Sequence, residues 1–324
     1  MTGNWVLIFM QNQLIKMQYI CSICICTYQM GDTIERCINS LLKNTSENVE
    51  IVIIDDGSTD NTSLICENIS NNINRINYIK FKRDPRRKLG ETRNISVNYA
   101  KSEVILLHVD ADDIWLEGIQ DIINYYIYIR YKLNIKKYLI GNHLAITTKE
   151  IFWKSKGYSN IYRGEDRDLM YRLAYNSDVL FIDHSIIHQR LKRKKNRTRI
   201  KSLKDLWSQS KYDVLYSDDI NKIFLSSLIF SPRNTTYTFV VRLLRFFFIP
   251  ICLLIYLKKR KRNIISWNEF MKYRSQNRGN AIELINKFNL ASLIEKKRDY
   301  AYEKSLINYP FEAKIKPKGF SINS

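Results

Sequence analysis

The sequence predicts an α/β fold, in which a mostly parallel sheet is flanked by helices. Two observations lead to this prediction. Apolar runs typical of buried strands alternate, over residues 19–113, with segments whose apolar residues recur at helical spacing. Three of these strand-like runs end in polar or acidic residues. Ligands bind at the carboxyl ends of the strands in open parallel sheets, so we expect a ligand site at that edge.

The predicted elements follow one another in a regular order. Strands are predicted at Tyr19–Cys26, Val49–Ile54, Ile76–Phe81 and Glu103–Val109. Helices are predicted at residues 34–42 with Asp32 as the N-cap, at about 61–70 and at 90–100. A basic loop, Lys82–Lys88, joins the third strand to the third helix.

A dense group of carboxylates ends the fourth strand. Asp110, Asp112 and Asp113 follow an apolar run directly, and so much buried charge is costly unless a cation lies beside it. Mg²⁺ or Mn²⁺ carrying a substrate phosphate would meet this need, since such hard cations take one or two carboxylates and share the remaining shell with water and phosphate. The alternative is an Asp-rich turn that caps a helix beginning near Trp115.

Other strand ends carry side chains that suit a nucleotide. Asp56 could accept a hydrogen bond from a base N–H, and Thr27 and Tyr28 could contact the base or the ribose. Arg93 could neutralise a phosphate or hold a carboxylate, and Gly90 would allow a close backbone approach. The alternative reading of the segment around Asp56 is a turn followed by a helix cap.

Two common nucleotide-binding patterns are absent from the sequence. The first strand is not followed by G-x-G-x-x-G, which disfavours a dinucleotide site. The sequence also has no G-x-x-x-x-G-K-[ST], which disfavours a P-loop nucleotide hydrolase.

Four motifs together resemble the family 2 glycosyltransferases of GT-A fold, which is a Rossmann-like fold. They are Ser22–Tyr28, Ile51–Asp60, Gly90–Asn94 and Asp110–Asp113, and they occur in the family's order and spacing. The resemblance covers roughly residues 19–190. It implies an inverting transfer from a nucleotide-diphosphate sugar, whose diphosphate is held by Mg²⁺ or Mn²⁺ at the Asp-x-Asp motif. One departure is that the family usually has Pro-Thr-Tyr-Asn where this chain has Cys26–Gln29.

The resemblance also implies roles for individual residues. Asp56 is similar to the ligand of the nucleotide base, and Thr27 and Tyr28 would line the nucleoside site. Asp110 and Asp112 would contact the ribose and the metal. Asp112 is the expected direct metal ligand, and Asp110 is expected to face the nucleotide.

An inverting transfer needs a base that deprotonates the acceptor hydroxyl. Gly164–Leu169 supplies carboxylates at the start of a predicted helix and resembles the family's Glu-Asp motif. We expect Asp166 to be the base and Glu165 to be its acceptor-binding neighbour. The alternative is that these acidic residues only complement the helix N-terminus, and a phosphate acceptor would need a base less.

The sequence has four histidines. In related GT-A enzymes a histidine after the Glu-Asp helix can join the metal shell, and His188 is preferred here over His184. His108 lies deeper in the fourth strand and is expected to be part of the scaffold.

The six cysteines favour a reducing compartment. Cys21 and Cys24 are spaced like a metal or redox motif, but residues three apart on a strand face opposite sides. We expect all six to be buried, reduced thiols. Trp5–Met10 is too short an apolar run for a secretory signal.

Charge divides the chain into two unlike halves. The net charge is +20, yet residues 1–150 carry 17 Lys and Arg against 17 Asp and Glu, whereas residues 151–324 carry 35 against 15. The excess indicates an anionic partner of the second half. The predicted organisation is an N-terminal extension (1–18), a catalytic domain (19–190, with nucleotide-sugar half 19–113 and acceptor half 114–190) and a basic helical region (191–324).

The C-terminal region combines a basic run with an apolar segment. The run at 190–199 is either a solvated loop or a contact for lipid headgroups or a phosphorylated acceptor. The segment 239–257 has its longest charge-free stretch at Phe246–Leu257, a helix of about 18 Å, which is short of a hydrocarbon core of about 30 Å. The cluster Lys258–Arg262 follows it at once. This pattern favours a helix lying in the plane of an anionic membrane surface, and the alternative is a buried core helix.

The sequence therefore predicts a metal-dependent inverting glycosyltransferase. Its acceptor would be a hydroxyl or a lipid phosphate, in a lipid-linked or membrane-proximal glycan, and the protein would be cytoplasmic and peripherally bound to the cytoplasmic face of the membrane. One rival is a sugar-phosphate nucleotidyltransferase, but Thr27–Thr33 lacks the Lys or Arg that its loop would need. Another is a basic nucleic-acid-binding protein, but the basic clusters lack interleaved aromatic residues, so we expect no nucleic acid partner.

Overall fold

A computed structural model describes the central part of the chain and selected later positions. The described residues are 18–116, 118–141, 143–161, 164–176, 178–181, 188–191 and 236–256, with single positions between 203 and 215 and between 270 and 274. Most of the predicted extension, most of the basic run at 190–199, and the basic cluster at 258–262 lie outside the described residues.

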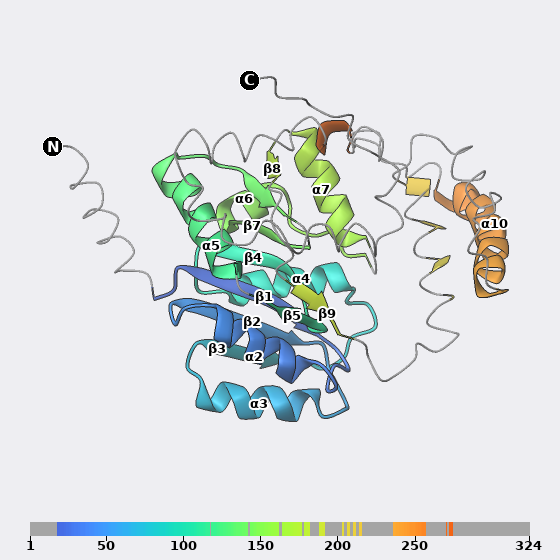
Figure 1. The fold of residues 1–324 in the computed structure, drawn as a ribbon. Coiled ribbons are helices and arrows are strands. Elements are labelled where there is room, and N and C mark those ends of the chain that lie inside the picture. Colours follow the sequence, from blue (N-terminus) through green and yellow to red (C-terminus); the bar gives the residue numbers. More distant parts are fainter. Residues whose placement is uncertain are drawn as a thin grey trace, which may run out of the picture.

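A seven-stranded sheet forms the centre of the molecule, in the order β3-β2-β1-β4-β7-β6-β8 (Figure 1). Its strands are β1 (Cys21–Thr27), β2 (Val49–Asp55), β3 (Ile76–Lys80), β4 (Val104–Asp110), β6 (Tyr138–Ile140), β7 (Ala145–Thr148) and β8 (Val179–Phe181). Among these strands β7 alone runs antiparallel to its neighbours, β4 and β6, and the remaining pairs are parallel. The mostly parallel sheet and the four predicted strands are thus confirmed.

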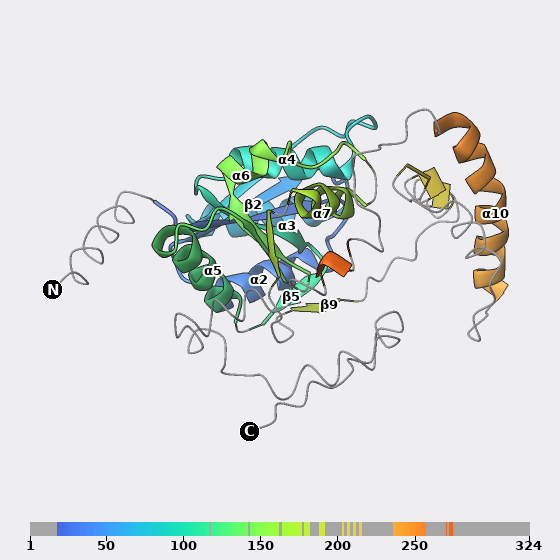
Figure 2. The ribbon, with the colours of Figure 1, turned by 90° about the horizontal axis from the view of Figure 1, so that it is seen from above.

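Helices cover both faces of this sheet (Figure 2). They are α2 (Ile34–Asn44), α3 (Thr62–Asn72), α4 (Leu89–Tyr99), α5 (Ile119–Ile127), α6 (Lys149–Lys154) and α7 (Glu165–Tyr175), and a π-helical turn, η1 (Tyr128–Lys132), extends α5. One apolar core lies between the sheet and α2, α3 and α5, and a second lies between the opposite face and α4, α6 and α7. Ile23 and Ile25 of β1 belong to the first core and Cys24 to the second, because successive strand residues point to opposite faces.

The predicted divergence of Cys21 and Cys24 is confirmed, whereas Cys26 is half-buried and not buried as expected. Cys21 faces the first core and Cys24 the second, so the two thiols diverge. All six cysteines are free, and five of them are buried. Burial raises the pKa of the Cys37 thiol and of the Cys24 thiol, which keeps both protonated.

A bulge near the end of β4 reverses which face its last residues occupy. Leu106 pairs with Ile23, yet Val109 pairs with Ile25, so β4 has one more residue than β1 in this stretch. His108, within the bulge, has a φ of 66°. Leu106 and Val109 consequently enter the same core although they are three residues apart, and Asp110 is directed to the face that α4 covers.

The structure contradicts the alternative in which Asp113 belongs to a turn that caps a helix near Trp115. No helix begins near Trp115; instead β5 (Asp113–Trp115) pairs antiparallel with β9 (His188–Arg190). The next helix, α5, begins at Ile119, directly after Gly118, which has the left-handed backbone conformation with a φ of 101°. Asp113 is 1% exposed within β5, so it is a buried strand residue and does not cap a helix.

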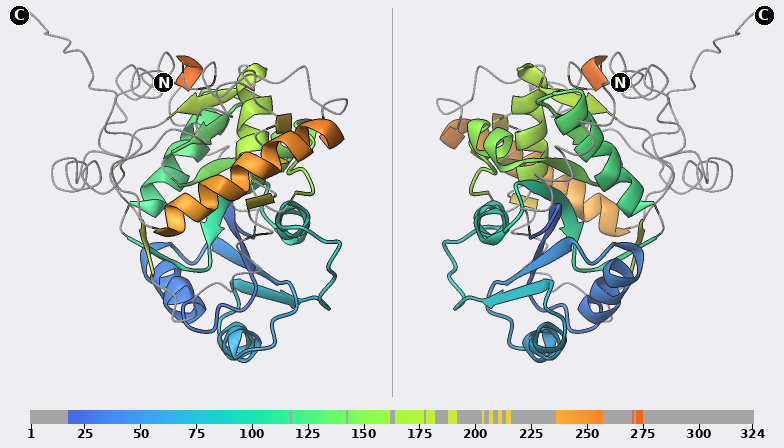
Figure 3. Two further views of the ribbon diagram at one scale, coloured as in Figure 1. Left: turned by 90° about the vertical axis from the view of Figure 1, so that its right-hand side faces the viewer. Right: turned by 90° about the vertical axis from the view of Figure 1, so that its left-hand side faces the viewer.

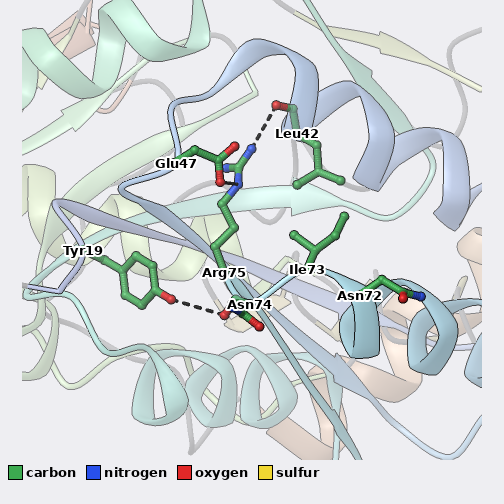
Figure 4. A pocket seen from close by; sticks show the side chains of 7 residues that line it. All are labelled: Tyr19, Leu42, Glu47, Asn72, Ile73, Asn74 and Arg75. Carbon is green, nitrogen blue, oxygen red and sulfur yellow. Dashed lines mark hydrogen bonds and ion pairs between the residues drawn. The ribbon is translucent and has the colours of Figure 1, made fainter.

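The opposite edge of the sheet holds a pocket that is structural in character. Figure 4 shows its lining, in which Arg75 lies beneath the end of α2. The Arg75 guanidinium donates to the carbonyl oxygens of Leu42, Thr45, Ser46 and Val49 at 2.9–3.2 Å. It therefore satisfies carbonyl groups that the end of α2 leaves without helical partners.

A long helix, α10 (Thr236–Tyr256), lies beside this body (Figure 1). It contains Pro250 and covers most of the predicted apolar segment. Among the described residues, no helix meets the length and hydropathy that crossing a membrane requires.

Candidate active site

The register of the central strands brings the predicted nucleotide residues to one edge. Thr27 at the end of β1 pairs with Asp55 of β2, and its neighbour Cys26 pairs with Asp110 of β4. Tyr28 and Asp56, which directly follow Thr27 and Asp55, therefore lie at the same edge of the sheet, formed by the carboxyl ends of its strands. Thr27 is 2% exposed, and its Oγ1 has no hydrogen-bond partner among the described residues.

Asp55 and Asp56 are adjacent in sequence but have different surroundings. Asp55 is fully buried and accepts hydrogen bonds from Ser58 Oγ at 2.6 Å, Ser63 Oγ at 2.8 Å and the Tyr78 hydroxyl at 3.0 Å. Asp55 Oδ1 also accepts from Ser58 N at 2.8 Å, so Asp55 forms the turn of the alternative reading, whereas helix α3 is preceded by Asn61. Asp56 follows the last residue of β2 and is paired with side chains of the loop beyond β3.

The Asp56 carboxylate lies between two guanidinium groups from the basic loop. Arg83 Nη1 donates to Asp56 Oδ2, and Arg87 Nε donates to Oδ1 at 2.6 Å. The Arg83 guanidinium also lies over the Tyr28 ring, with its carbon 4.7 Å from the ring centroid, which is within cation–π distance. Tyr28 and Asp56, both predicted to contact the nucleoside, are therefore neighbours through Arg83.

Sequence reasoning missed the two arginines individually. The loop Lys82–Lys88 was expected only to be basic. The pairing of β2 with β3 could have singled out Arg83 and Arg87. Asp55 pairs with Lys80, and the Asp55 carbonyl accepts a hydrogen bond from Phe81 N at 2.9 Å. The residues that follow Phe81 therefore lie next to Asp56.

Arg93 joins the nucleotide side of the site to α7. Its Nη2 donates to Asp110 Oδ1 at 2.9 Å, and its Nε lies 3.1 Å from Glu165 Oε1. Burial by itself lowers the pKa of Arg93, but the two carboxylates outweigh burial and raise it above its usual value. Two roles were expected for Arg93, neutralising a phosphate or holding a carboxylate. In the structure it holds two carboxylates.

Glu165 and Asp166 begin α7, directly after Gly164, whose φ is 84°. The Glu165 side chain is 5% exposed, and burial raises its pKa to about 7; Arg93 opposes that rise and Asp166 adds to it. Asp166 is half-buried, and its Oδ1 accepts from Arg167 N at 2.8 Å. With Glu165 committed to Arg93, Asp166 is the more accessible carboxylate of the pair.

Asp168, in the same helix turn, has a structural role. Its Oδ2 accepts from Ser159 Oγ at 2.5 Å and from Arg172 Nη2 at 2.9 Å. Arg172 Nη2 in turn donates to the Gly157 carbonyl at 2.6 Å. Asp168 and Arg172 thus fasten the loop that precedes α7.

The close backbone approach at Gly90 is made by this same loop. A Cβ added to Gly90 would lie 2.0 Å from the Ser159 carbonyl oxygen. Asn94, one turn further along α4, donates to the Tyr158 carbonyl at 2.8 Å and accepts from its N–H at 2.9 Å. The motif Gly90–Asn94 therefore holds the loop 157–159 in place beside Arg93.

The predicted metal residues are close in sequence and differ in exposure. The Asp110 side chain is 36% exposed, whereas Asp112 is buried, with 8% of the whole residue exposed. The backbone of His188 lies in β9 opposite Trp115, and Leu191 N donates to the Asp112 carbonyl at 2.7 Å, so β9 runs beside Asp112. His184 lies outside the described residues. Among the described residues, no three His, Cys, Asp or Glu form a metal-binding group by themselves.

His108 contacts the interior side of the site. Its ring lies 5.9 Å from the Tyr158 ring, and burial, reinforced by Arg93, lowers the pKa of His108 to about 4. Its imidazole is therefore neutral at pH 7, which agrees with a place in the scaffold.

Comparison with known proteins assigns the domain. Residues 22–175 match the model of glycosyl transferase family 2, and this part of the chain belongs to that family. The predicted fold class, a GT-A domain with a mostly parallel sheet flanked by helices, is thereby confirmed for these residues.

Individual relatives match the chain over limited stretches. The glycosyltransferase GlyG of Streptococcus pneumoniae is 32% identical over 102 residues, covering 32% of this chain and 33% of GlyG. An Escherichia coli protein, the UDP-Glc:alpha-D-GlcNAc-diphosphoundecaprenol beta-1,3-glucosyltransferase WfgD, is 31% identical over 145 residues, covering 42% of this chain and 50% of WfgD. The chain thus spans half or less of the length of these relatives. The structure of S. aureus TarS 1–349 in complex with UDP-GlcNAc has a TM-score of 0.48 at 17% identity, covering 61% of this chain and 67% of TarS 1–349.

Proposed function

We propose that this protein is an inverting, metal-dependent glycosyltransferase that moves a sugar from a nucleotide-diphosphate sugar to a lipid-linked or membrane-proximal glycan acceptor. The observation that carries the proposal is the position of Arg93 between Asp110 and Glu165. It holds a carboxylate of the predicted donor site next to the carboxylate pair of the predicted acceptor site. A group transfer needs this proximity, since the two substrates must meet at one point.

The surroundings of Asp56 favour uracil as the nucleotide base. The Arg83 guanidinium, the Asp56 carboxylate and the Arg87 guanidinium offer a hydrogen-bond donor, an acceptor and a donor in that order. The imide edge of uracil offers the complementary acceptor, donor and acceptor. A carboxylate has about four lone-pair positions, so Asp56 can accept from a base while it stays paired with both arginines. The relatives WfaP and WfgD carry UDP-Glc in their names, which agrees with a uridine nucleotide.

The donor set at the end of β4 fits a hard divalent cation. Asp110 and Asp112 offer carboxylate oxygens at a partly open site, and we propose that they hold Mg²⁺ or Mn²⁺ together with the diphosphate, with His188 as a further ligand. We expect the diphosphate and water to complete the shell of such a metal, as hard divalent cations share their shells with both. Such a metal would neutralise the charge that develops on the leaving diphosphate.

The acceptor oxygen would attack the anomeric carbon from the face opposite the diphosphate. As the new carbon–oxygen bond forms, the bond to the diphosphate breaks and its electron pair leaves with the nucleotide. Asp166 would take the proton of the attacking hydroxyl. Glu165, held by Arg93, would position the acceptor, and Arg93 would keep Asp110 aligned.

The proposed acceptor is lipid-linked. WfaP is 36% identical over 95 residues and WfgD 31% over 145, and both names specify an undecaprenol-linked diphosphate acceptor. A lipid-linked acceptor would place the enzyme peripherally at the cytoplasmic face of the membrane. An acceptor that is itself a lipid phosphate would need little help from Asp166, so the two acceptor types predict different results for Asp166→Asn.

The test is turnover of a panel of sugar nucleotides with Mn²⁺, with lipid extract as acceptor and products identified by mass spectrometry. We expect metal-dependent turnover with a UDP-sugar, and a loss of about a hundredfold or more in Asp112→Ala, equivalent to about 2.7 kcal/mol of transition-state stabilisation. Asp121→Ala, an exposed position on α5, is the matched control and should retain full activity.

Other results would favour a rival. Formation of a sugar nucleotide from a sugar phosphate and a nucleoside triphosphate would indicate a nucleotidyltransferase. Tight, salt-dependent RNA binding without metal-dependent turnover of any sugar nucleotide would overturn the proposal.

A further inference from the structure

Helix α10 has one face that packs against protein. Ile249 and Cys252 are fully buried there and cluster with Val214, with Trp207 and Leu253 packed around them. The Trp207 and Phe248 rings meet edge to face at 5.4 Å between centroids. This contact defines an inner side of the helix.

The other side of α10 exposes an apolar stripe. Its members are Leu243, Phe247, Ile251, Leu254 and Ile255, which are 45–87% exposed. Their spacing of three and four residues places them within about 120° of the circumference, at about 100° per residue. Figures 1 and 2 show α10 to one side of the central sheet and its helices, and in Figure 3 it lies in front when that side faces the viewer. A continuous exposed apolar stripe of this kind marks an interaction surface.

The charge around the stripe identifies its partner. Residues 236–262 contain seven Lys and Arg, five of them in Lys258–Arg262, and no Asp or Glu. A second copy of the chain would bring two such basic clusters together, and a nucleic acid would leave the apolar stripe in water. A lipid surface with anionic headgroups matches both properties, since acyl chains accept the stripe and headgroups attract the basic cluster.

We infer that α10 lies in the plane of an anionic lipid surface, with the stripe Leu243–Ile255 inserted between the headgroups. The basic sequence Lys258–Arg262 that follows favours anionic headgroups. The in-plane orientation follows because the exposed large apolar residues lie on one side of α10, while its other side packs against Val214 and Trp207. This inference concerns a surface outside the candidate active site and stands whether or not the proposed glycosyl transfer is correct.

The test is co-sedimentation of the full-length protein with lipid vesicles. Wild type should pellet with vesicles that contain phosphatidylglycerol and remain largely free with vesicles of phosphatidylcholine alone. The double variant F247E/L254E should lose about tenfold or more of its partitioning, because a charge on the inserted side opposes burial in lipid. Both positions are exposed, so the substitutions should leave the thermal unfolding temperature unchanged.

Controls separate the stripe from surface hydrophobicity in general. Leu64→Glu makes the same chemical change at a 60% exposed position on α3 and should bind vesicles like wild type. Replacing the five basic residues at 258–262 by Gln should weaken binding to anionic vesicles, and added salt should weaken wild-type binding.

Three outcomes would overturn the inference. F247E/L254E could pellet like wild type, or wild type could bind neutral and anionic vesicles equally. Alternatively, wild type could be a dimer in light scattering that F247E/L254E converts to monomer, which would make the stripe an interface between copies. Turnover of a soluble sugar nucleotide by F247E/L254E reports separately on the proposed function.

Discussion

At the scale of single residues, the candidate site consists of arginine side chains paired with carboxylates. Arg93 links Asp110 to Glu165, and Arg83 with Arg87 encloses Asp56. A buried carboxylate without such a partner would be protonated or destabilising. The arginines therefore allow several acids to lie together at one strand-end edge, and this has measurable consequences for pH dependence and for donor binding.

Glu165 should make stability depend on pH. Its pKa of about 7 in the folded protein exceeds the value of about 4.3 for an unfolded glutamate. The folded state therefore binds more protons between these values, and the stabilisation present below about pH 4.5 is lost as the pH rises through 7. We expect the free energy of unfolding of wild type, relative to Glu165→Gln, to fall by about 1–3 kcal/mol between pH 4.5 and 7.5. Urea denaturation of both proteins across this range measures it, and a constant difference would contradict it.

Arg83 and Arg87 should contribute to donor binding. Arg83→Ala and Arg87→Ala should each raise the dissociation constant for UDP by about tenfold, the loss expected for one charge-assisted hydrogen bond. Arg86→Ala is the matched control, because Arg86 lies in the same loop, pairs with Asp84 and is 92% exposed on its side chain. Isothermal titration calorimetry compares the three variants, and equal losses in all of them would indicate a general charge effect.

At the scale of elements, α4 and the loop 157–159 act as one unit. Gly90 admits the Ser159 carbonyl, Asn94 bonds the Tyr158 backbone twice, and Arg172 of α7 holds Gly157. This loop supports Arg93 from the acceptor side, since the Arg93 guanidinium carbon lies 5.8 Å from the Tyr158 ring centroid. Two helices distant in sequence are thereby held at a constant separation across the site.

Loss of the Asn94 amide should loosen this unit. Asn94→Ala leaves both backbone groups of Tyr158 without their partner and should lower the free energy of unfolding by about 1–3 kcal/mol. Asn98→Ala is the same substitution one turn further along α4, at an exposed position, and should change stability by less than about 0.5 kcal/mol. Chemical denaturation distinguishes the two, and similar losses would show that the loop does not depend on Asn94.

At the scale of the whole molecule, we propose that different parts bind different partners. The sheet and its two helix layers gather the predicted nucleotide and acceptor residues at one edge, and at the opposite edge the Arg75 guanidinium donates hydrogen bonds to carbonyl groups at the end of α2. Helix α10 presents its apolar stripe outside this body. Donor binding should therefore be a property of the family 2 domain, and lipid binding a property of α10.

Donor and metal should stabilise the protein together. A ligand that binds only the folded state adds about 2.7 kcal/mol at a hundredfold excess over its dissociation constant. We expect UDP with Mn²⁺ to raise the unfolding temperature more than UDP or Mn²⁺ alone, and Asp112→Ala to lose this joint increment. Differential scanning fluorimetry measures each condition, and an equal increment in Asp112→Ala would remove Asp112 from the metal site.

The elements and the location of the site could be predicted from the sequence because both depend on local patterns. The period of apolar residues identified the first four strands of the chain and the helices between them, and polar residues after three of those strands identified the edge. The pairing of carboxylates with particular arginines could not be predicted. Arg93 and Glu165 are far apart in the chain, and only packing of α4 beside α7 brings them within 3.1 Å.

The sequence by itself determined the strand–helix alternation, the family motifs and the separation of a neutral first half from a basic second half. Tertiary structure decided the rest. The bulge in β4 chose the face for Asp110, pairing with β9 made Asp113 a strand residue, and packing against Val214 left one side of α10 exposed. The physical reason is that apolar periodicity is a property of neighbours in the chain, whereas register, burial and ion pairing depend on residues that meet only after folding.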